Sequence, residues 1–227
     1  MIMTRLEFRQ ALHFFFGLGP SGLPASARCK CGHSDTIPSP QTNLPHMLSC
    51  KSLGWRITRH NALVDDIHRW MRDRRIHVEK EFIADGEGRI DFWVRSEGVV
   101  YWCDAVVTEP GCPSIVARAS REAGEAGRAA ETKKVKKYKP LADLDGATVI
   151  PLAFETTGRR GEELEKFLRQ LEDASTGQSL ASLYLQLSVT MAKMNVALVR
   201  EAVRNATGVR ALCGRRISYS NRRAPAA

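Results

Sequence analysis

Residues 99–107, with the sequence VVYWCDAVV, decide the fold that this chain predicts. Most of these side chains are β-branched or aromatic, which favours a strand with both faces covered. The turn residues Ser96-Glu97-Gly98 lead into the stretch, and the prolines at 110 and 113 end it. A single acid, Asp104, lies within this otherwise apolar strand.

Shorter elements with clear patterns lie on both sides of this strand. Two strand-like runs at 78–84 and 89–95 precede it, separated by the turn residues 85–88, and a helix with its apolar residues at helical spacing is expected to begin near His60. An alanine-rich helix at 114–138 follows, and then a strand at 147–154 in which Pro151 must take an end or edge position. The order helix, three strands, helix, strand predicts an α/β fold with a mixed sheet.

The last quarter of the chain predicts further helices at 161–171 and 179–205. The second of these keeps a 4-3-4-3-4 spacing of apolar residues: Leu180, Tyr184, Leu187, Met191, Met194 and Leu198. A helix that closes over the core is the favoured interpretation, and a seam for a second copy or a partner is the alternative. We predict four segments: an N-terminal segment at 1–55, a core at 56–175, a C-terminal helix at 176–214, and a basic disordered tail at 215–227.

The composition favours an anionic partner. The 227 residues contain 34 basic and 25 acidic side chains, which gives a net charge of +9 and a pI near 9.5. No apolar run approaches the length of a membrane span, and the apolar residues 12–16 are too few for a secretory signal. We therefore expect an intracellular protein whose six cysteines are metal ligands or buried thiols rather than disulfides.

Asp91 and Asp104 are the candidate metal ligands. Because a turn at 96–98 joins their strands, the two aspartates are expected nearly opposite each other, about 5 Å apart. Two like charges repel there unless a cation offsets them, and Mg²⁺ or Mn²⁺ suits one or two carboxylates together with water and a phosphate. Such an ion orients a phosphodiester and activates water for its hydrolysis. The alternative is that Asp104 only bonds a backbone group at the end of the buried part of its strand.

A lysine cluster ends the helix that follows, in the sequence Lys133-Lys134-Val135-Lys136-Lys137-Tyr138-Lys139. Lys134, Lys137 and Tyr138 share one helix face at i, i+3 and i+4. A nuclease needs a cation that binds the scissile phosphate and stabilises the growing charge, and Lys134 or Lys137 is the candidate. The alternative role is to complement the dipole at the helix C-terminus.

Three glutamates are weaker candidates. Glu79 or Glu81, on the first strand, is a candidate third acid near the metal, against a solvated strand face. Glu155, after the last strand, is either a helix-entry residue or a contact to the site.

Cysteines and a histidine near the amino terminus form the pattern C-x-C-x14-H-x3-C, through Cys29, Cys31, His46 and Cys50. Three thiolates and one imidazole suit tetrahedral Zn²⁺, although C-x-C is tighter than the usual C-x2-C and His33 competes with His46. The surrounding prolines and polar residues cannot build a core, so a bound metal explains how this segment folds. Unrelated free cysteines are the alternative, and Cys103, Cys112 and Cys213 have no such pattern.

The combined order of these motifs resembles the carboxy-terminal region of site-specific non-LTR retrotransposon proteins. It consists of the C-C-H-C knuckle, the helix start Arg59-His60-Asn61, two aspartates separated by 12 residues, and the K-V-x-K-Y segment at 134–138. The resemblance covers roughly residues 28–155. In that family a zinc knuckle precedes a restriction-like endonuclease that nicks target DNA to prime reverse transcription.

The resemblance implies a restriction-endonuclease-like PD-(D/E)xK core, with the element order α-β-β-β-α-β, an N-terminal zinc knuckle and C-terminal helices. It makes Asp91 and Asp104 the metal-binding acids, and Lys134 and Lys137 the family's lysines, one of which is catalytic. Cys29, Cys31, His46 and Cys50 become the knuckle.

Two departures bear on activity. Ile90 stands where the family usually has proline before the first aspartate, and the chain has no reverse transcriptase segment. In wider restriction-like nucleases a lysine often stands two residues after the second acid, where this chain has Val106, so its lysine must come from the helix. These departures leave an active nuclease and a decayed copy both open.

The sequence thus predicts a Mg²⁺-dependent endodeoxyribonuclease that nicks DNA, with DNA as its partner, RNA as a further partner, and a reverse transcriptase domain on a separate chain. A nuclear location follows from that role, no membrane is expected, and the oligomeric state stays open. The alternatives are a catalytically inactive nucleic-acid-binding remnant and a zinc-stapled adaptor that uses the apolar seam.

Overall fold

A computed structural model describes residues 2–20, 31, 44–51, 53–84, 88–172 and 179–207. Its centre is a four-stranded sheet in the order β1-β2-β3-β4, made of β1 (His77–Ala84), β2 (Gly88–Ser96), β3 (Val99–Thr108) and β4 (Thr148–Glu155). The first three strands are antiparallel neighbours, and β4 pairs parallel to β3. This α/β architecture, a mixed sheet with helices packed on it, confirms the predicted class.

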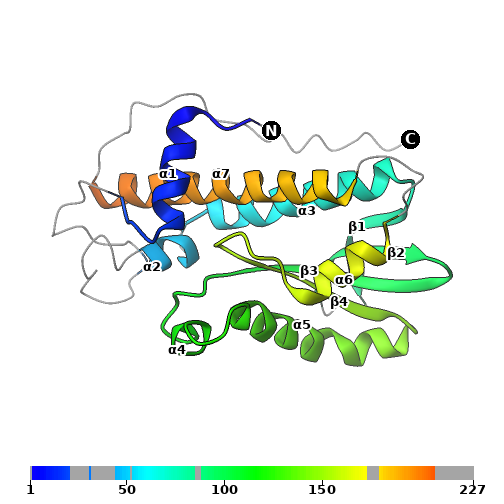
Figure 1. Ribbon diagram of the computed structural model, residues 1–227. Coiled ribbons are helices and arrows are strands. Elements are labelled where there is room, and N and C mark those ends of the chain that lie inside the picture. Colours follow the sequence, from blue (N-terminus) through cyan, green and yellow to red (C-terminus); the bar gives the residue numbers. More distant parts are fainter. Residues whose placement is uncertain are drawn as a thin grey trace.

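Helices cover both faces of the sheet (Figure 1). On one face α3 (Trp55–Asp73), α6 (Glu162–Gln170) and α7 (Leu180–Thr207) enclose the main core with the inward residues of β2, β3 and β4. On the other face α5 (Glu125–Leu144) packs a smaller cluster that includes Ile90, Trp102 and Tyr138. Strands β2 and β3 are therefore buried between two helical layers, which fits their long apolar runs.

The predicted helix at 114–138 is two helices in the structure. The short α4 (Val116–Ala119) and α5 are separated by residues that include Gly124, whose φ of 86° is the left-handed conformation that glycine adopts without strain. Helix α5 then continues past the expected end and contains Pro140, an exposed residue. Pro151, in contrast, lies where it was predicted, because β4 is an edge strand of the sheet.

The apolar seam of α7 is buried within the chain itself. Leu180, Leu187 and Met191 belong to the main core, while Met194 and Leu198 are also buried and Tyr184 is partly buried. Helix α7 lies along α3, as Figure 1 shows. This confirms the interpretation of a helix closing over the core, and it removes the seam as a free surface for a partner.

Two short helices near the amino terminus, α1 (Arg5–Phe15) and α2 (Leu44–Ser49), also pack on α7. The buried Arg59 fixes α2 in place, since its guanidinium donates to the Leu48 carbonyl at 3.0 Å and to Asn195 Oδ1 of α7 at 2.8 Å. Within the ranges given above, no helix combines the length and the hydropathy that crossing a bilayer requires.

Two buried carboxylates accept hydrogen bonds from backbone N–H groups in the first turns of α5 and α6. Glu155, at the end of β4, accepts the backbone N–H of Gly127 in the first turn of α5. Glu131 of α5 accepts the N–H of Glu163 in the first turn of α6. These bonds satisfy amides that a helix N-terminus leaves without partners. Of the two roles considered for Glu155, the structure therefore shows the helix-entry role.

Candidate active site

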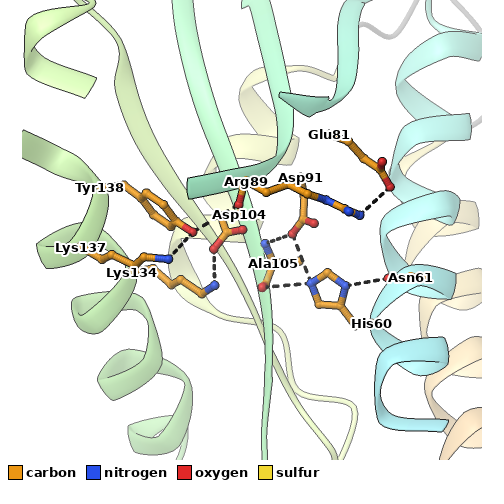
Figure 2. Close-up of polar contacts among 10 residues, drawn as sticks. All are labelled: His60, Asn61, Glu81, Arg89, Asp91, Asp104, Ala105, Lys134, Lys137 and Tyr138. Atoms are coloured by element: carbon orange, nitrogen blue, oxygen red, sulfur yellow. Dashed lines mark hydrogen bonds and ion pairs between the residues drawn. The ribbon is translucent and has the colours of Figure 1, made fainter. Parts of the chain in front are cut away.

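Asp104 lies near the middle of β3, the strand between β2 and β4, and is 5% exposed. It follows Trp102 by two residues, so alternation along the strand turns both side chains toward α5. There Lys134 of α5 donates a hydrogen bond to the Asp104 carboxylate (Figure 2). The carboxylate is thus paired with a cation, as its burial requires.

Asp91 of β2 makes its contacts on the opposite side, with α3. Its Oδ2 lies 3.2 Å from Nε2 of His60 and accepts the backbone N–H of Ala105 at 2.7 Å. The same His60 nitrogen lies 3.2 Å from the Ala105 carbonyl oxygen, while Nδ1 lies 3.2 Å from Oδ1 of Asn61. Figure 2 shows two separate sets of contacts, with His60 and Asp91 in one and Asp104 and Lys134 in the other.

The two aspartates separate because β2 loses its alternation at Asp91. Phe92 packs in the core on the α3 side, yet Ile90, two residues earlier, packs with the α5 cluster. The β2–β3 ladder runs to the pair Phe92–Cys103, and the next pair in that register, Asp91–Asp104, is absent from it. The two aspartates therefore do not form the expected pair on one face: the ladder ends one residue before them, and their side chains make contacts on opposite sides of the sheet.

The neighbouring strand is irregular at the same level. In the β1–β2 register Glu81 stands opposite Asp91, and this pair is also missing while the pairs on both sides of it form. Glu81 has a φ of 60°, a conformation that a glutamate adopts only at a cost of about 1–3 kcal/mol. The regular pairing of β1 with β2 and of β2 with β3 is thus interrupted at Asp91, the candidate metal ligand.

The environment moves the pKa values of the two aspartates in opposite directions. Burial raises the pKa of Asp104, and the charge and hydrogen bond of Lys134 offset only part of this. Burial also acts on Asp91, but the hydrogen bond and charge of His60, with the Ala105 amide, outweigh it and lower the pKa. For His60, burial alone would lower the pKa, and the contacts with Asp91 raise it instead. Paired carboxylates with separated pKa values are common at functional sites.

The second candidate lysine occupies a different position. Lys137 donates to the hydroxyl of Tyr138 at 2.8 Å, and that hydroxyl donates to the Arg89 carbonyl at 3.4 Å. The hydrogen bond to Tyr138 and the charge of Asp104 raise the pKa of Lys137. Of the two lysines, Lys134 therefore contacts a candidate acid directly, whereas Lys137 contacts Tyr138.

A cavity of about 510 Å³ opens beside Asp91, between α3 and the β1–β2 hairpin. Polar side chains line much of it, namely Thr58, Asn61, Asp65, Lys80, Glu81, Arg89 and Asp91. Glu81 pairs with Arg89 at 2.6 Å, and Glu79 lies 3.7 Å from His77. Of the candidate third acids, Glu81 shares this cavity with Asp91 and Glu79 does not line it.

The cysteine and histidine pattern gathers where it was expected. The ligand atoms of Cys31, His46 and Cys50 all lie within 4.8 Å of one another, and Cys31 Sγ is 3.5 Å from His46 Nε2. Among the described histidine, cysteine, aspartate and glutamate residues, these three form the one group of at least three whose ligand atoms lie that close together. Cys29, the fourth predicted ligand, and His33, the competing one, lie outside the described residues.

His60 is the site residue to which the sequence pattern assigned no role. Its motif contributed to the family resemblance, but no contact was predicted for it. A signal was present, because His60 precedes Leu63 and Ile67 by three and seven residues, which places it on the apolar face of α3. A polar residue on a core-facing stripe requires a partner, and here the partner is Asp91.

Comparison with known proteins adds no relative to this description. No protein-family model matches the chain, and no curated protein matches it.

Proposed function

We propose that this protein is a metal-dependent endonuclease that hydrolyses phosphodiester bonds in DNA, with Asp91 and Asp104 as metal ligands and Lys134 at the scissile phosphate. The observation that carries the proposal is the approach of Lys134 to Asp104, one residue from Ala105, whose amide binds Asp91. Two acids and a lysine thus lie around one short stretch of β3: Lys134 on Asp104, and Asp91 on the amide of the next residue.

The element order supports the same proposal. Helix α3, strands β1 to β3, helix α5 and strand β4 follow the order expected of a restriction-like core, with the parallel strand at the edge. The two acids lie on the β2–β3 hairpin, and the lysine comes from α5, as in the retroelement type of such a core, because Val106 stands two residues after Asp104. The proposal assigns this chain to that group, to a role in target-DNA nicking, and to the nucleus.

The residues of the site fit a hard divalent cation such as Mg²⁺ or Mn²⁺. The carboxylate of Asp91 and the Ala105 carbonyl are oxygen ligands of the right chemistry, and the cavity beside Asp91 gives access from solvent. When bound, such an ion activates water and neutralises charge on the phosphate. Lys134, now paired with Asp104, supplies a cation for the phosphate oxygens.

The Cys31, His46 and Cys50 group is the proposed zinc site. Its ligands are soft donors that suit Zn²⁺, and the packing of Cys50 with Leu53 and Leu198 fixes the segment against α7. In this proposal the ion is structural and holds the amino-terminal segment to the core.

Plasmid nicking tests the proposal. Supercoiled plasmid is incubated with wild type, Asp91→Asn or Asp104→Asn in Mg²⁺ and in Mn²⁺. We expect nicked circles with wild type, and a loss of at least about tenfold to a hundredfold with each variant, a range already reached by changes next to metal ligands. Asp143→Asn is the matched control, because Asp143 is an exposed aspartate of α5 paired with Lys139.

The alternative is a nucleic-acid-binding protein without catalysis, which the net charge of +9 and the candidate zinc site favour. If wild type shifts the plasmid on a gel but leaves it supercoiled in both metals, that alternative replaces the nuclease. If Asp143→Asn is as impaired as the two site variants, the loss reflects folding, and the assignment of Asp91 and Asp104 fails.

A further inference from the structure

We propose that His60 is a direct ligand of the divalent cation, through Nε2, next to Asp91 Oδ2 and the Ala105 carbonyl oxygen. The inference rests on the proposed function, and it adds a further ligand to the metal site and a preference for Mn²⁺ over Mg²⁺. A set with one imidazole and oxygen ligands favours Mn²⁺ over Mg²⁺, because imidazole binds first-row transition metals whereas Mg²⁺ prefers oxygen ligands alone.

The first argument is the chemistry of the atoms around the ring. The polar contacts of His60 are all with oxygens: Asn61 Oδ1, Asp91 Oδ2 and the Ala105 carbonyl, each at 3.2 Å. A neutral imidazole has one N–H and one lone pair. When Nδ1–H donates to Asn61, the lone pair of Nε2 faces two oxygens with lone pairs of their own. A cation at that point takes the place of the Nε2 proton that otherwise joins His60 to Asp91, and makes ligands of Nε2, Asp91 Oδ2 and the Ala105 carbonyl oxygen.

The second argument is spacing. An octahedral ion with ligands at about 2.1 Å keeps neighbouring ligands about 3.0 Å apart. Nε2 of His60 lies 3.2 Å from each of the two oxygens, so an ion is accommodated with shifts of a few tenths of an ångström. The Ala105 amide holds Asp91 Oδ2 at 2.7 Å, which fixes this oxygen before any ion arrives.

The third argument is access. The His60 side chain is 29% exposed and that of Asp91 is 12% exposed, so neither is sealed in the core. Asp91 and Asn61, the two side-chain neighbours of His60, both line the 510 Å³ cavity. The ligand set also accounts for the distortion at Asp91, because regular alternation would turn this carboxylate away from α3.

Asp104 has a separate role in this arrangement. Its carboxylate is turned toward Lys134 on the α5 side of β3, while His60 and Asp91 meet on the α3 side. His60, Asp91 and Asp104 accordingly do not form a three-residue group within 4.8 Å. In this arrangement of the side chains the proposed ion would therefore have Asp91, the Ala105 carbonyl oxygen and His60 as its protein ligands, while Asp104 stays paired with Lys134.

Pulsed EPR of bound Mn²⁺ tests the proposal on the full chain. The protein is first loaded with Zn²⁺, so that the thiolate group containing His46 is filled, and is then titrated with Mn²⁺ alone. We expect nitrogen modulation from a coordinated imidazole, which changes frequency when the protein is labelled with ¹⁵N-histidine. His60→Gln should lose this modulation and bind Mn²⁺ at least about tenfold more weakly.

His68→Gln is the matched control, since His68 lies on the same helix and stacks on Phe92 in the core. It should retain both the modulation and the affinity for Mn²⁺. Wild-type protein that binds Mn²⁺ without nitrogen modulation overturns the proposal, and this result does not depend on whether the variants fold. Equal affinity of wild type and His60→Gln overturns it as well.

These outcomes separate the inference from the proposed function. Nicking that depends on Asp91, without nitrogen modulation, leaves the nuclease in place and removes His60 from the ligand set. Nitrogen modulation in a protein that does not nick DNA in either metal keeps the metal site and removes the nuclease.

Discussion

Replacing Lys134 with methionine, which keeps the length of the chain and removes the charge, tests the pairing with Asp104 directly. Breaking a buried ion pair costs about 3–5 kcal/mol, because a charge is left without compensation. The Asp104 side chain is 7% exposed but that of Lys134 is 24% exposed, so water screens part of the loss. Asp104 can also take up a proton, which limits the cost further. We therefore expect Lys134→Met to lower the free energy of unfolding by about 2 kcal/mol at pH 7.5.

The loss of stability in Lys134→Met should grow as the pH rises. Burial raises the pKa of Asp104 in the folded protein, so its contribution to stability is fully present below the unfolded pKa and is lost as pH rises through the folded pKa. Without Lys134 the folded pKa rises further and that loss becomes larger. The difference between variant and wild type should thus be small near pH 4 and reach its full size at neutral pH.

Urea denaturation at several pH values measures the effect, and a melting shift of about 4–8 °C should accompany it at pH 7.5. Lys136→Met, an exposed lysine of the same helix, is the control and should change stability by less than about 0.5 kcal/mol. In an Asp104→Asn background the cost of Lys134→Met should disappear. A loss of stability that is the same at every pH, or that persists in the double variant, would refute the reasoning.

Three other perturbations have expected outcomes. Chelation of zinc or Cys50→Ser should lower the melting temperature and the measured zinc content together, whereas a zinc-free protein with an unchanged melting curve contradicts a structural ion. Arg59→Met should cost about 2–4 kcal/mol in urea denaturation, because the carbonyl and amide that Arg59 contacts lose their donor, and a neutral result contradicts that role. Leu187→Ala should cost about 2–5 kcal/mol, while the exposed Leu185→Ala should stay within about 0.5 kcal/mol, and equal effects of the two variants contradict the burial of the seam.

Local patterns in the sequence predicted the four strands and most of the helices packed on them, but not α2 (Leu44–Ser49), which contains Pro45. The VVYWCDAVV stretch became β3, and the turn at 96–98 fixed the register of β2 and β3. Pro151 correctly indicated an edge strand, since a proline has no backbone N–H to donate to a neighbouring strand. The helix break at Gly124 was missed because an alanine-rich composition masks a single glycine that takes a positive φ.

The sequence selected candidate site residues, but it predicted neither their geometry nor the contact of His60. Residue type and spacing selected Asp91, Asp104 and Lys134, and the structure brings all three into one region. Which way Asp91 points depends on the loss of alternation between Ile90 and Phe92, which the pattern of residues does not reveal. The contact between His60 and Asp91 joins two elements far apart in sequence, and a helix face alone does not identify its partner.

Helix α7 has a consequence for deciding which related sequences encode a folded protein. Asp91, Asp104, Lys134 and His60 all precede residue 140, yet Leu180, Leu183, Leu187 and Met191 complete the main core against α3. A premature stop codon after residue 175 leaves all of the site motifs intact and still removes part of the interior of the protein. An open reading frame through the end of α7 is therefore a better criterion for a working gene than the presence of the acids and lysines.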